Sequence, residues 1–123
     1  MIRVANLQDS AALTALWNEA FIDGPVRARP DRFTDTEVAH TIMRGECFTV
    51  VERGDILATA LLAANGSYPA NLTESDDDAQ IVLVAVAERA RRRGFGKLVV
   101  SAAVAAAGQR GVKRVWLWSR PEQ

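Results

Sequence analysis

A cluster of basic residues between Glu88 and Lys97 holds the side chains best placed for chemistry in this sequence. It reads E-R-A-R-R-R-G-F-G-K, and its cations are Arg89, Arg91, Arg92, Arg93 and Lys97, set around two glycines. Such a cluster suits a nucleic-acid backbone, a bound phosphate or a solvated surface. The elements on either side of it decide which of these applies.

The basic cluster lies between a predicted strand and a predicted helix. Residues 79–87 are apolar throughout, which is typical of a strand covered on both faces. The segment from Gly94 to about Gln109 is alanine-rich and predicts a helix. Cations at a helix N-terminus are unfavourable by about 0.3–1 kcal/mol each, unless an anion binds there. Gly94 and Gly96 would let the backbone approach such an anion closely.

Periodicity and capping residues predict the elements that position this cluster. The expected elements are a strand at Ile2–Val4, a helix from Asp9 or Ser10 to about Phe21, a helix from a Thr34-x-x-Glu37 box to Gly45, a hairpin of Cys47–Glu52 and Ile56–Ala64 around Gly54-Asp55, and a final strand at Val115–Ser119. The order β-α-α-β-β-β-α-β predicts an α/β (α+β) fold with helices packed on a sheet. One domain over residues 1–123 is expected from this length.

Composition limits the classes of protein that are plausible. Fifteen basic residues balance fifteen acidic ones, which argues against a general nucleic-acid binder. There is no run of 18 apolar residues, and the start lacks the pattern of a secretory signal, so no membrane partner is expected. Cys47 is the single cysteine, and no spacing of residues suggests a metal site. A cytoplasmic location is the expectation.

The glycines of the cluster exclude two common phosphate-binding loops. A Walker loop needs Ser or Thr after Gly96-Lys97, where Leu98 stands, and a dinucleotide fingerprint needs a third glycine at Val99. The hexapeptide R-R-R-G-F-G, residues 91–96, matches [QR]-x-x-G-x-[GA] and resembles the pyrophosphate loop of the GNAT superfamily of acyl-CoA N-acyltransferases. The preceding V-A-V-A-E-R-A, the alanine-rich helix, and the early I-R-V-A and L-W-N-E-A-F segments are also similar to that family.

The resemblance implies a mixed central sheet and a site for acetyl-CoA, with no metal. Backbone N–H groups from Arg92 to Lys97 would hold the pyrophosphate. The strand backbone before them would pair with the pantetheine arm, and one N–H there would face the thioester oxygen. The predicted cofactor-binding residues are Val84, Ala85, Val86, Arg91, Arg92, Arg93, Gly94, Phe95, Gly96 and Lys97.

The resemblance implies a general base that this sequence does not clearly supply. The histone-acetylating branch uses a glutamate at the position of Gln80, and glutamine cannot accept the proton. Asp78 would share the face of Gln80 if the strand begins that early, and is the candidate base. The alternative is that Asp78 is an exposed loop acid beside Asp76 and Asp77. His40 is a further candidate on the second predicted helix.

Other residues could bind the amine substrate that accepts the acetyl group. Glu19 and Asp23 could bind a cationic substrate, whereas Arg27, Arg29 and Arg32 in the predicted loop could bind an anionic group or be solvated. Cys47, at the start of an inner strand, is expected to be a packing residue rather than a nucleophile.

The resemblance is incomplete at the C-terminus. Family members usually continue after the fifth strand with a helix, which often provides a tyrosine acid, and two more strands. The single tyrosine here, Tyr68, lies in an earlier predicted loop. The sequence is therefore expected to be a truncated form, a natural short form, or a chain completed by a partner. Trp116 and Trp118 leave both faces of the last strand apolar, which favours a homodimer, unless they pack within the chain.

Three functions follow from these patterns. The first is an N-acetyltransferase that moves an acetyl group from acetyl-CoA to a primary amine, of a small molecule or a protein, by direct attack. The second is an acyl-CoA-binding module with little catalysis that needs a partner chain. The third is a nucleic-acid or anion binder using the arginines alone, for which nearby aromatic residues for base stacking are lacking.

Overall fold

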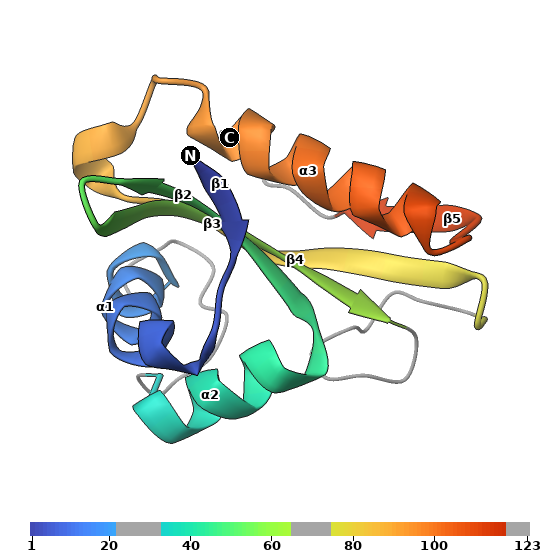
Figure 1. The fold of residues 1–123 in the computed structure, drawn as a ribbon, viewed down its shortest axis with the longest axis horizontal. Coiled ribbons are helices and arrows are strands. Elements are labelled where there is room, and N and C mark those ends of the chain that lie inside the picture. The colour runs from blue at the N-terminus through green and yellow to red at the C-terminus, as the bar shows by residue number, and fades with distance from the viewer. Residues whose placement is uncertain (22–32, 65–74, 118–123) are drawn as a thin grey trace.

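A five-stranded mixed sheet carries the other elements of the fold (Figure 1). In the computed structural model, which describes residues 1–21, 33–64 and 75–117, the strands lie side by side in chain order. They are β1 (Ile2–Val4), β2 (Glu46–Glu52), β3 (Asp55–Ala64), β4 (Asp78–Val86) and β5 (Arg114–Leu117). The pairs β1–β2, β2–β3 and β3–β4 are antiparallel, and the pair β4–β5 is parallel. The predicted mixed sheet and element order are confirmed.

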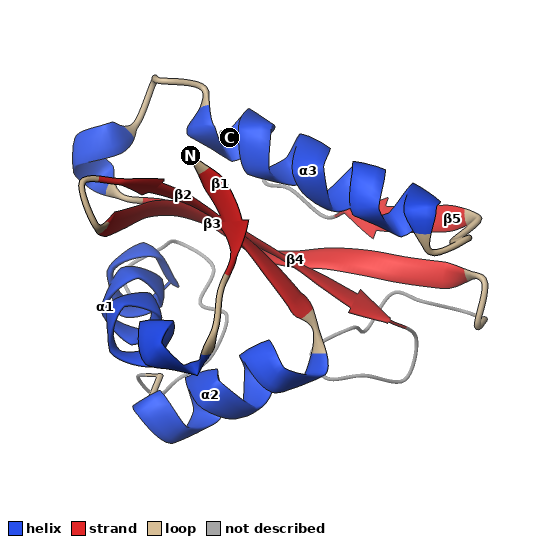
Figure 2. Cartoon of the chain, viewed as in Figure 1, coloured by secondary structure: helices blue, strands red, loops and turns tan. Residues whose placement is uncertain are grey.

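Helices cover both faces of this sheet, as Figure 2 shows. The helices α1 (Ser10–Phe21) and α2 (Asp35–Arg44) lie on one face, and α3 (Phe95–Gln109) lies on the other. Two short 3-10 helices, η1 (Leu7–Asp9) and η2 (Glu88–Ala90), were not expected from the sequence. The sheet is therefore the middle layer of three, and β3 and β4 contribute buried side chains to both interfaces.

The two interfaces are packed with side chains of different size. On the α1–α2 side, Leu13, Trp17 and Leu61 are completely buried. On the α3 side, Ala103 and Ala107 of the helix pack against small and medium residues of the sheet. Small side chains on α3 let this helix lie close to the strands, so the start of α3 is held near the end of β4.

Helix α2 begins and ends for different reasons. The Thr34 hydroxyl accepts the Glu37 N–H at 3.2 Å, as the predicted capping box requires. The helix ends before Gly45, as expected, but Gly45 is extended, with φ −142°, rather than left-handed. A Cβ atom at Gly45 would lie 2.8 Å from the Leu62 carbonyl oxygen. Close approach to β3, and not turn geometry, therefore requires glycine there.

The β2–β3 hairpin closes one residue earlier than predicted. Arg53 and Gly54 both have positive φ, 54° and 82°, which is the pattern of a two-residue type I′ turn. Asp55 accordingly begins β3 instead of completing the turn. The hairpin tip brings Glu52 and Asp55 to the same end of the sheet as the basic cluster.

Strand β4 contains one extra residue relative to β3. Between the pairs Thr59–Ala85 and Leu61–Val82, β3 has one residue and β4 has two. The extra residue produces a β-bulge at Leu83, whose φ is +53°. The sequence predicts a regular strand at 79–87, so the strand is confirmed and the bulge is new.

Cys47 is 1% exposed in the core between the sheet and helices α1 and α2. Burial raises the pKa of its thiol to about 12. A thiol in this environment stays protonated and packs as a small apolar side chain, which agrees with the predicted packing role.

We expect the Cys47 thiol to resist alkylation in the native protein. At pH 8 it should carry about a thousandfold less thiolate than an ordinary cysteine, and its access is blocked as well. Iodoacetamide labelling followed by mass spectrometry should show almost no modification in buffer and complete modification in 6–8 M urea, about the range that unfolds small domains. Rapid labelling of the folded protein would contradict the buried position.

Candidate active site

The turn between η2 and α3 has backbone geometry suited to an anion. Arg92 and Gly94 are left-handed, with φ 68° and 81°, and Arg93 between them is not. Such an alternation turns successive N–H groups toward one concave side, which is the arrangement of an anion-binding nest. A Cβ atom at Gly94 would meet open space, so crowding does not require glycine there. The left-handed φ does, because side chains other than glycine disfavour it.

Helix α3 extends the same set of donors. Its first internal hydrogen bond runs from the Leu98 N–H to the Gly94 carbonyl at 3.1 Å. The N–H groups of Phe95, Gly96 and Lys97 precede that bond and have no carbonyl within the helix. A Cβ atom at Gly96 would lie 3.3 Å from Val86 Cγ2, so glycine here keeps the helix start against β4. The turn and the helix start therefore point their donors at one place.

Two of the five cations in the cluster are bound to the β2–β3 hairpin. Arg93 donates to both carboxylate oxygens of Glu52, at 3.2 and 2.9 Å, and its guanidinium lies 4.5 Å from the centre of the Phe95 ring. The hydrogen bond from Arg93 holds the pKa of Glu52 below its usual range. Arg89 forms a longer ion pair with Asp55, at 3.3 Å.

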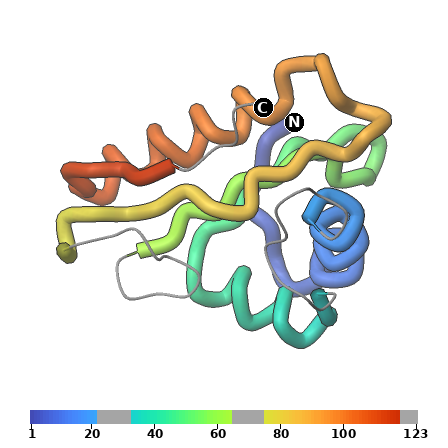
Figure 3. Tube along the Cα trace, turned by 180° about the vertical axis from the view of Figure 1, so that it is seen from behind, coloured from blue at the N-terminus to red at the C-terminus, as the bar shows by residue number. Residues whose placement is uncertain are grey.

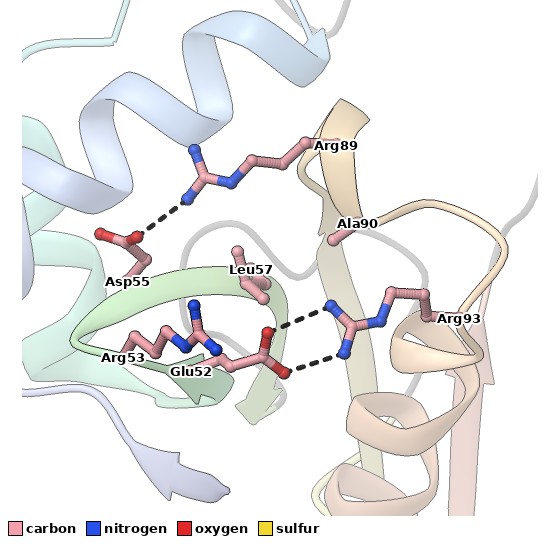
Figure 4. A pocket seen from close by; sticks show the side chains of 7 residues that line it. All are labelled: Glu52, Arg53, Asp55, Leu57, Arg89, Ala90 and Arg93. Carbon is pink, nitrogen blue, oxygen red and sulfur yellow. Dashed lines mark hydrogen bonds and ion pairs between the residues drawn. The ribbon is translucent and has the colours of Figure 1, made fainter.

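These ion pairs close the two sides of a small cavity, shown in Figure 4. The cavity has a volume of about 190 Å³. Its lining residues come from the hairpin and from the segment leading to α3, and are Glu52, Arg53, Asp55, Leu57, Arg89, Ala90 and Arg93. The carboxylates of the hairpin thus hold the outgoing chain at Arg89, within η2, and at Arg93, in the turn that follows it.

The other three cations remain available. Arg91, Arg92 and Lys97 are exposed, and the described residues give none of them an acidic partner. The sequence groups Arg93 with them as a cofactor-binding residue. The structure places the Arg93 side chain on Glu52, so its side chain supports the turn while its backbone forms part of it.

The outer edge of β4 offers backbone donors ahead of this turn. The Ala87 N–H donates to the Leu57 carbonyl of β3 at 2.8 Å. Because strand N–H groups alternate in direction, those of Val86 and Val84 point to the opposite edge, away from β3. Ala85 is paired with β3 and directs its groups there. Of the three strand residues predicted to bind the pantetheine arm, two therefore present an N–H to the outer edge.

Strand β5 leaves that part of the edge uncovered within the described residues. The pairing of β5 with β4 ends at Leu117 and Ile81. Figure 3 shows β5 beside the first half of β4 only, with the second half leading to the turn and to α3. Residues 82–86 of β4 thus have no described strand on their outer side.

Asp78 differs from the expectation of an exposed loop acid. It begins β4 and is 1% exposed. Arg114 donates to both of its oxygens, at 2.7 and 3.1 Å, and the Trp116 indole N–H donates at 3.1 Å. Gln80, on the same strand face, is 3% exposed. Burial and these donors make Asp78 a link between β4 and β5.

The remaining candidates are spread over the fold. His40 is exposed on α2, and Glu19 on α1 accepts the Glu88 N–H at 3.1 Å, which fixes η2. The candidates outside the described residues are Asp23, Arg27, Arg29, Arg32, Tyr68 and Trp118. The supporting roles of Glu52 and Thr59 were not expected from the sequence, because nothing in their local sequence marks a partner more than 20 residues away.

Neither a metal site nor a membrane-spanning helix is found in the described part of the chain. Residues 1–21, 33–64 and 75–117 contain no group of three or more His, Cys, Asp or Glu side chains arranged to hold a metal ion. None of the helices described is long and apolar enough to span a membrane.

We expect Glu52→Gln to loosen the turn without unfolding the protein. The exposed ion pair contributes little to global stability, so the melting temperature should change little. The backbone ¹⁵N order parameters of residues 92–95 should fall from about 0.85 toward about 0.6, because Arg93 loses its charged anchor. NMR relaxation measured on both proteins tests this.

Asp55→Asn is the matched control for that experiment. It removes the partner of Arg89 on the same hairpin and leaves the Arg93–Glu52 pair intact. An equal fall of the order parameters in both variants would show that Arg93 has no special role.

The fold and the sequence were compared with known proteins. The N-acetyltransferase of Staphylococcus aureus Mu50 has 23% identity and a TM-score of 0.76, over 91% of this chain and 68% of that one. A putative acetyltransferase of Agrobacterium tumefaciens str. C58 has 26% identity and a TM-score of 0.73, over 100% of this chain and 83% of that one. A predicted acetyltransferase of Clostridium acetobutylicum, solved with acetyl-CoA, has 18% identity and a TM-score of 0.77, over 99% of this chain and 82% of that one. A search of curated proteins gave no significant match. Residues 11–123 match the model of the acetyltransferase (GNAT) family, and the chain therefore belongs to that family.

Proposed function

We propose that this protein is an N-acetyltransferase that moves an acetyl group from acetyl-CoA to a primary amine by direct attack. Family membership supports acetyl transfer. The observation that carries the proposal is the turn at residues 91–97, where left-handed backbone, a helix start and three cations with no acidic partner among the described residues coincide. Those donors fit a pyrophosphate, whose oxygens accept hydrogen bonds and carry negative charge.

The outer edge of β4 fits the pantetheine arm of acetyl-CoA. The N–H groups of Val84 and Val86 point to that edge, and pantetheine contains amide groups that can pair with a strand. The edge continues directly into the turn, so one extended molecule can use both. Ala85, which faces β3, would contribute through its small side chain and not through its backbone groups.

Bound acetyl-CoA supplies an activated acetyl thioester. Transfer joins the amine nitrogen to the acetyl carbon as the bond to sulfur breaks, and CoA leaves as the thiolate, which takes up the proton that the amine loses. The chain itself holds the donor at the turn and along β4. A backbone N–H at the outer edge stabilises the negative charge that develops on an acyl oxygen. The described residues do not assign the proton acceptor for the amine.

Asp78 is a poor base in the structure as it stands. To take a proton it would have to give up the donors from Arg114 and Trp116 in a buried setting, which is costly. We propose instead that it joins β5 to β4. The predicted homodimer, the predicted lack of nucleic-acid and membrane partners, and the cytoplasmic location stay predictions of the sequence.

An acyl-CoA-binding module is the second candidate, and Gln80 is the observation that favours it. It is buried on β4 at the position where the resemblance places a glutamate base. Release of free thiol from acetyl-CoA, measured colorimetrically with a panel of amines, distinguishes the two. An acceptor-dependent release above the uncatalysed rate supports an enzyme, whereas binding without release supports the module.

We expect the wild-type chain to bind acetyl-CoA in the micromolar range, about −8 kcal/mol, in a calorimetric titration. Gly94→Glu should weaken binding at least a hundredfold, or about 2.7 kcal/mol, because it adds a carboxylate where the turn would hold phosphates. Gly111→Glu is the matched control. Gly111 is also left-handed, with φ 75°, and open around its Cβ, but it lies beyond the far end of α3. Failure of the folded wild-type chain to bind would refute the proposal.

A further inference from the structure

We propose that Trp17 and Thr59 are positioning residues that aim the Val84 N–H at the outer edge of β4. This inference rests on the proposed acetyl-CoA site and assigns a role to two buried side chains that do not reach that edge themselves. Its evidence is a chain of hydrogen bonds that ends at the bulge.

This series of hydrogen bonds begins on helix α1 and links it to β3 and then to β4. The Trp17 indole N–H donates to the Thr59 hydroxyl oxygen at 3.0 Å. The Thr59 hydroxyl then donates to the Leu83 carbonyl oxygen at 2.9 Å. Thr59 has one hydroxyl hydrogen, so accepting from Trp17 leaves that hydrogen directed at Leu83. The donor and the acceptor of each hydrogen bond in the series are therefore fixed.

The peptide group between Leu83 and Val84 transmits this direction. A trans peptide is planar, and its C=O and N–H bonds point in opposite directions. When Thr59, on the β3 side, holds the Leu83 carbonyl, the Val84 N–H must point away from β3. That is the edge that no described strand covers beyond the Ile81–Leu117 pair. Rotation of this peptide plane would remove the donor from the edge.

The bulge is where such rotation would otherwise be easy. Leu83 has a left-handed backbone, which costs a residue other than glycine about 1–2 kcal/mol. The extra residue also interrupts the regular ladder between β3 and β4. Thr59 replaces the missing ladder partner with a side-chain hydroxyl. Without it, the carbonyl would be a partly buried acceptor lacking this partner, and the peptide could relax to another orientation.

The hydrogen bond also strengthens the donor. An acceptor bond at a carbonyl polarises the peptide, and linked hydrogen bonds strengthen one another in a low-dielectric setting. Trp17 and Thr59 are both 0% exposed, so water does not compete for either group. The Val84 N–H is thereby both oriented and polarised, which are the two properties that a donor to a developing oxyanion requires.

A simpler role for both residues is core packing. The Trp17 ring lies 5.7 Å from the Phe33 ring, and such contacts contribute to stability whatever the indole N–H does. The two roles are separated by variants that keep volume and remove the polar group. Thr59→Val removes the hydroxyl, Thr59→Ser keeps it, and Trp17→Phe keeps an aromatic ring without the N–H.

The experiment uses acetyl-CoA labelled with ¹³C at the acetyl carbonyl. A hydrogen bond to a thioester oxygen moves its carbonyl signal downfield, so binding to the wild-type chain should displace the signal. The displacement should shrink in Thr59→Val and in Trp17→Phe and return in Thr59→Ser, with affinities within about threefold of wild type. If thiol release is measurable, its kcat should fall about tenfold or more in Thr59→Val with little change in the KM for acetyl-CoA.

Each outcome has a definite meaning. Failure of the wild-type chain to bind acetyl-CoA would defeat the proposed function itself. Binding with the same displacement in wild type, Thr59→Val and Trp17→Phe would overturn the positioning role alone. Because Thr59→Val could fail to fold, circular dichroism and thermal melting are recorded for each variant. The Trp17→Phe and Thr59→Ser pair then decides the question without Thr59→Val.

Discussion

The extra residue in β4 is the constraint on which the rest of the site depends. Val82 and Leu83 both pack on the α1–α2 side, after which Val84 packs on the α3 side. Because side chains alternate along a strand, removing one residue would exchange the faces of everything that follows. The left-handed leucine costs about 1–2 kcal/mol, and hydrogen bonds of about 1 kcal/mol each from Trp17 and Thr59 are sufficient to offset it. A tertiary contact therefore determines the strand geometry.

Positive charge is concentrated around the turn, although the sequence as a whole has no net charge. Five cations gather at the start of α3. Glu52 and Asp55 neutralise two of them and hold the backbone in place. Arg91, Arg92 and Lys97 keep their charge beside a helix N-terminus, where each is unfavourable by about 0.3–1 kcal/mol. An anion bound at the turn would convert this repulsion into attraction, so binding and local stability are coupled.

Much of the fold could be predicted because its signals are local. The Thr34 cap and the Gly94 turn are set by the residues themselves, and the alanine-rich helix identified α3. The bulge could not be predicted, since Leu83 has the composition of an ordinary strand residue and its backbone depends on Thr59. Asp78 looked like a loop acid for a similar reason. Its burial follows from Arg114, which reaches it only once β5 has paired with β4.

The bulge separates two stretches of β4 with different surroundings. An extra residue changes both the register and the twist of a strand. Before the bulge, residues 78–81 pair with β5 over its described residues, which end at Leu117. The ion pair between buried Asp78 and half-exposed Arg114 joins the two strands at the start of β4. Beyond the bulge, the outer edge of β4 has no strand partner among the described residues. It continues into a turn and a helix start whose N–H groups have no intrahelical partners. A ligand matching this surface must combine an extended arm containing amides with a compact anionic group, which are the two parts of a coenzyme A thioester.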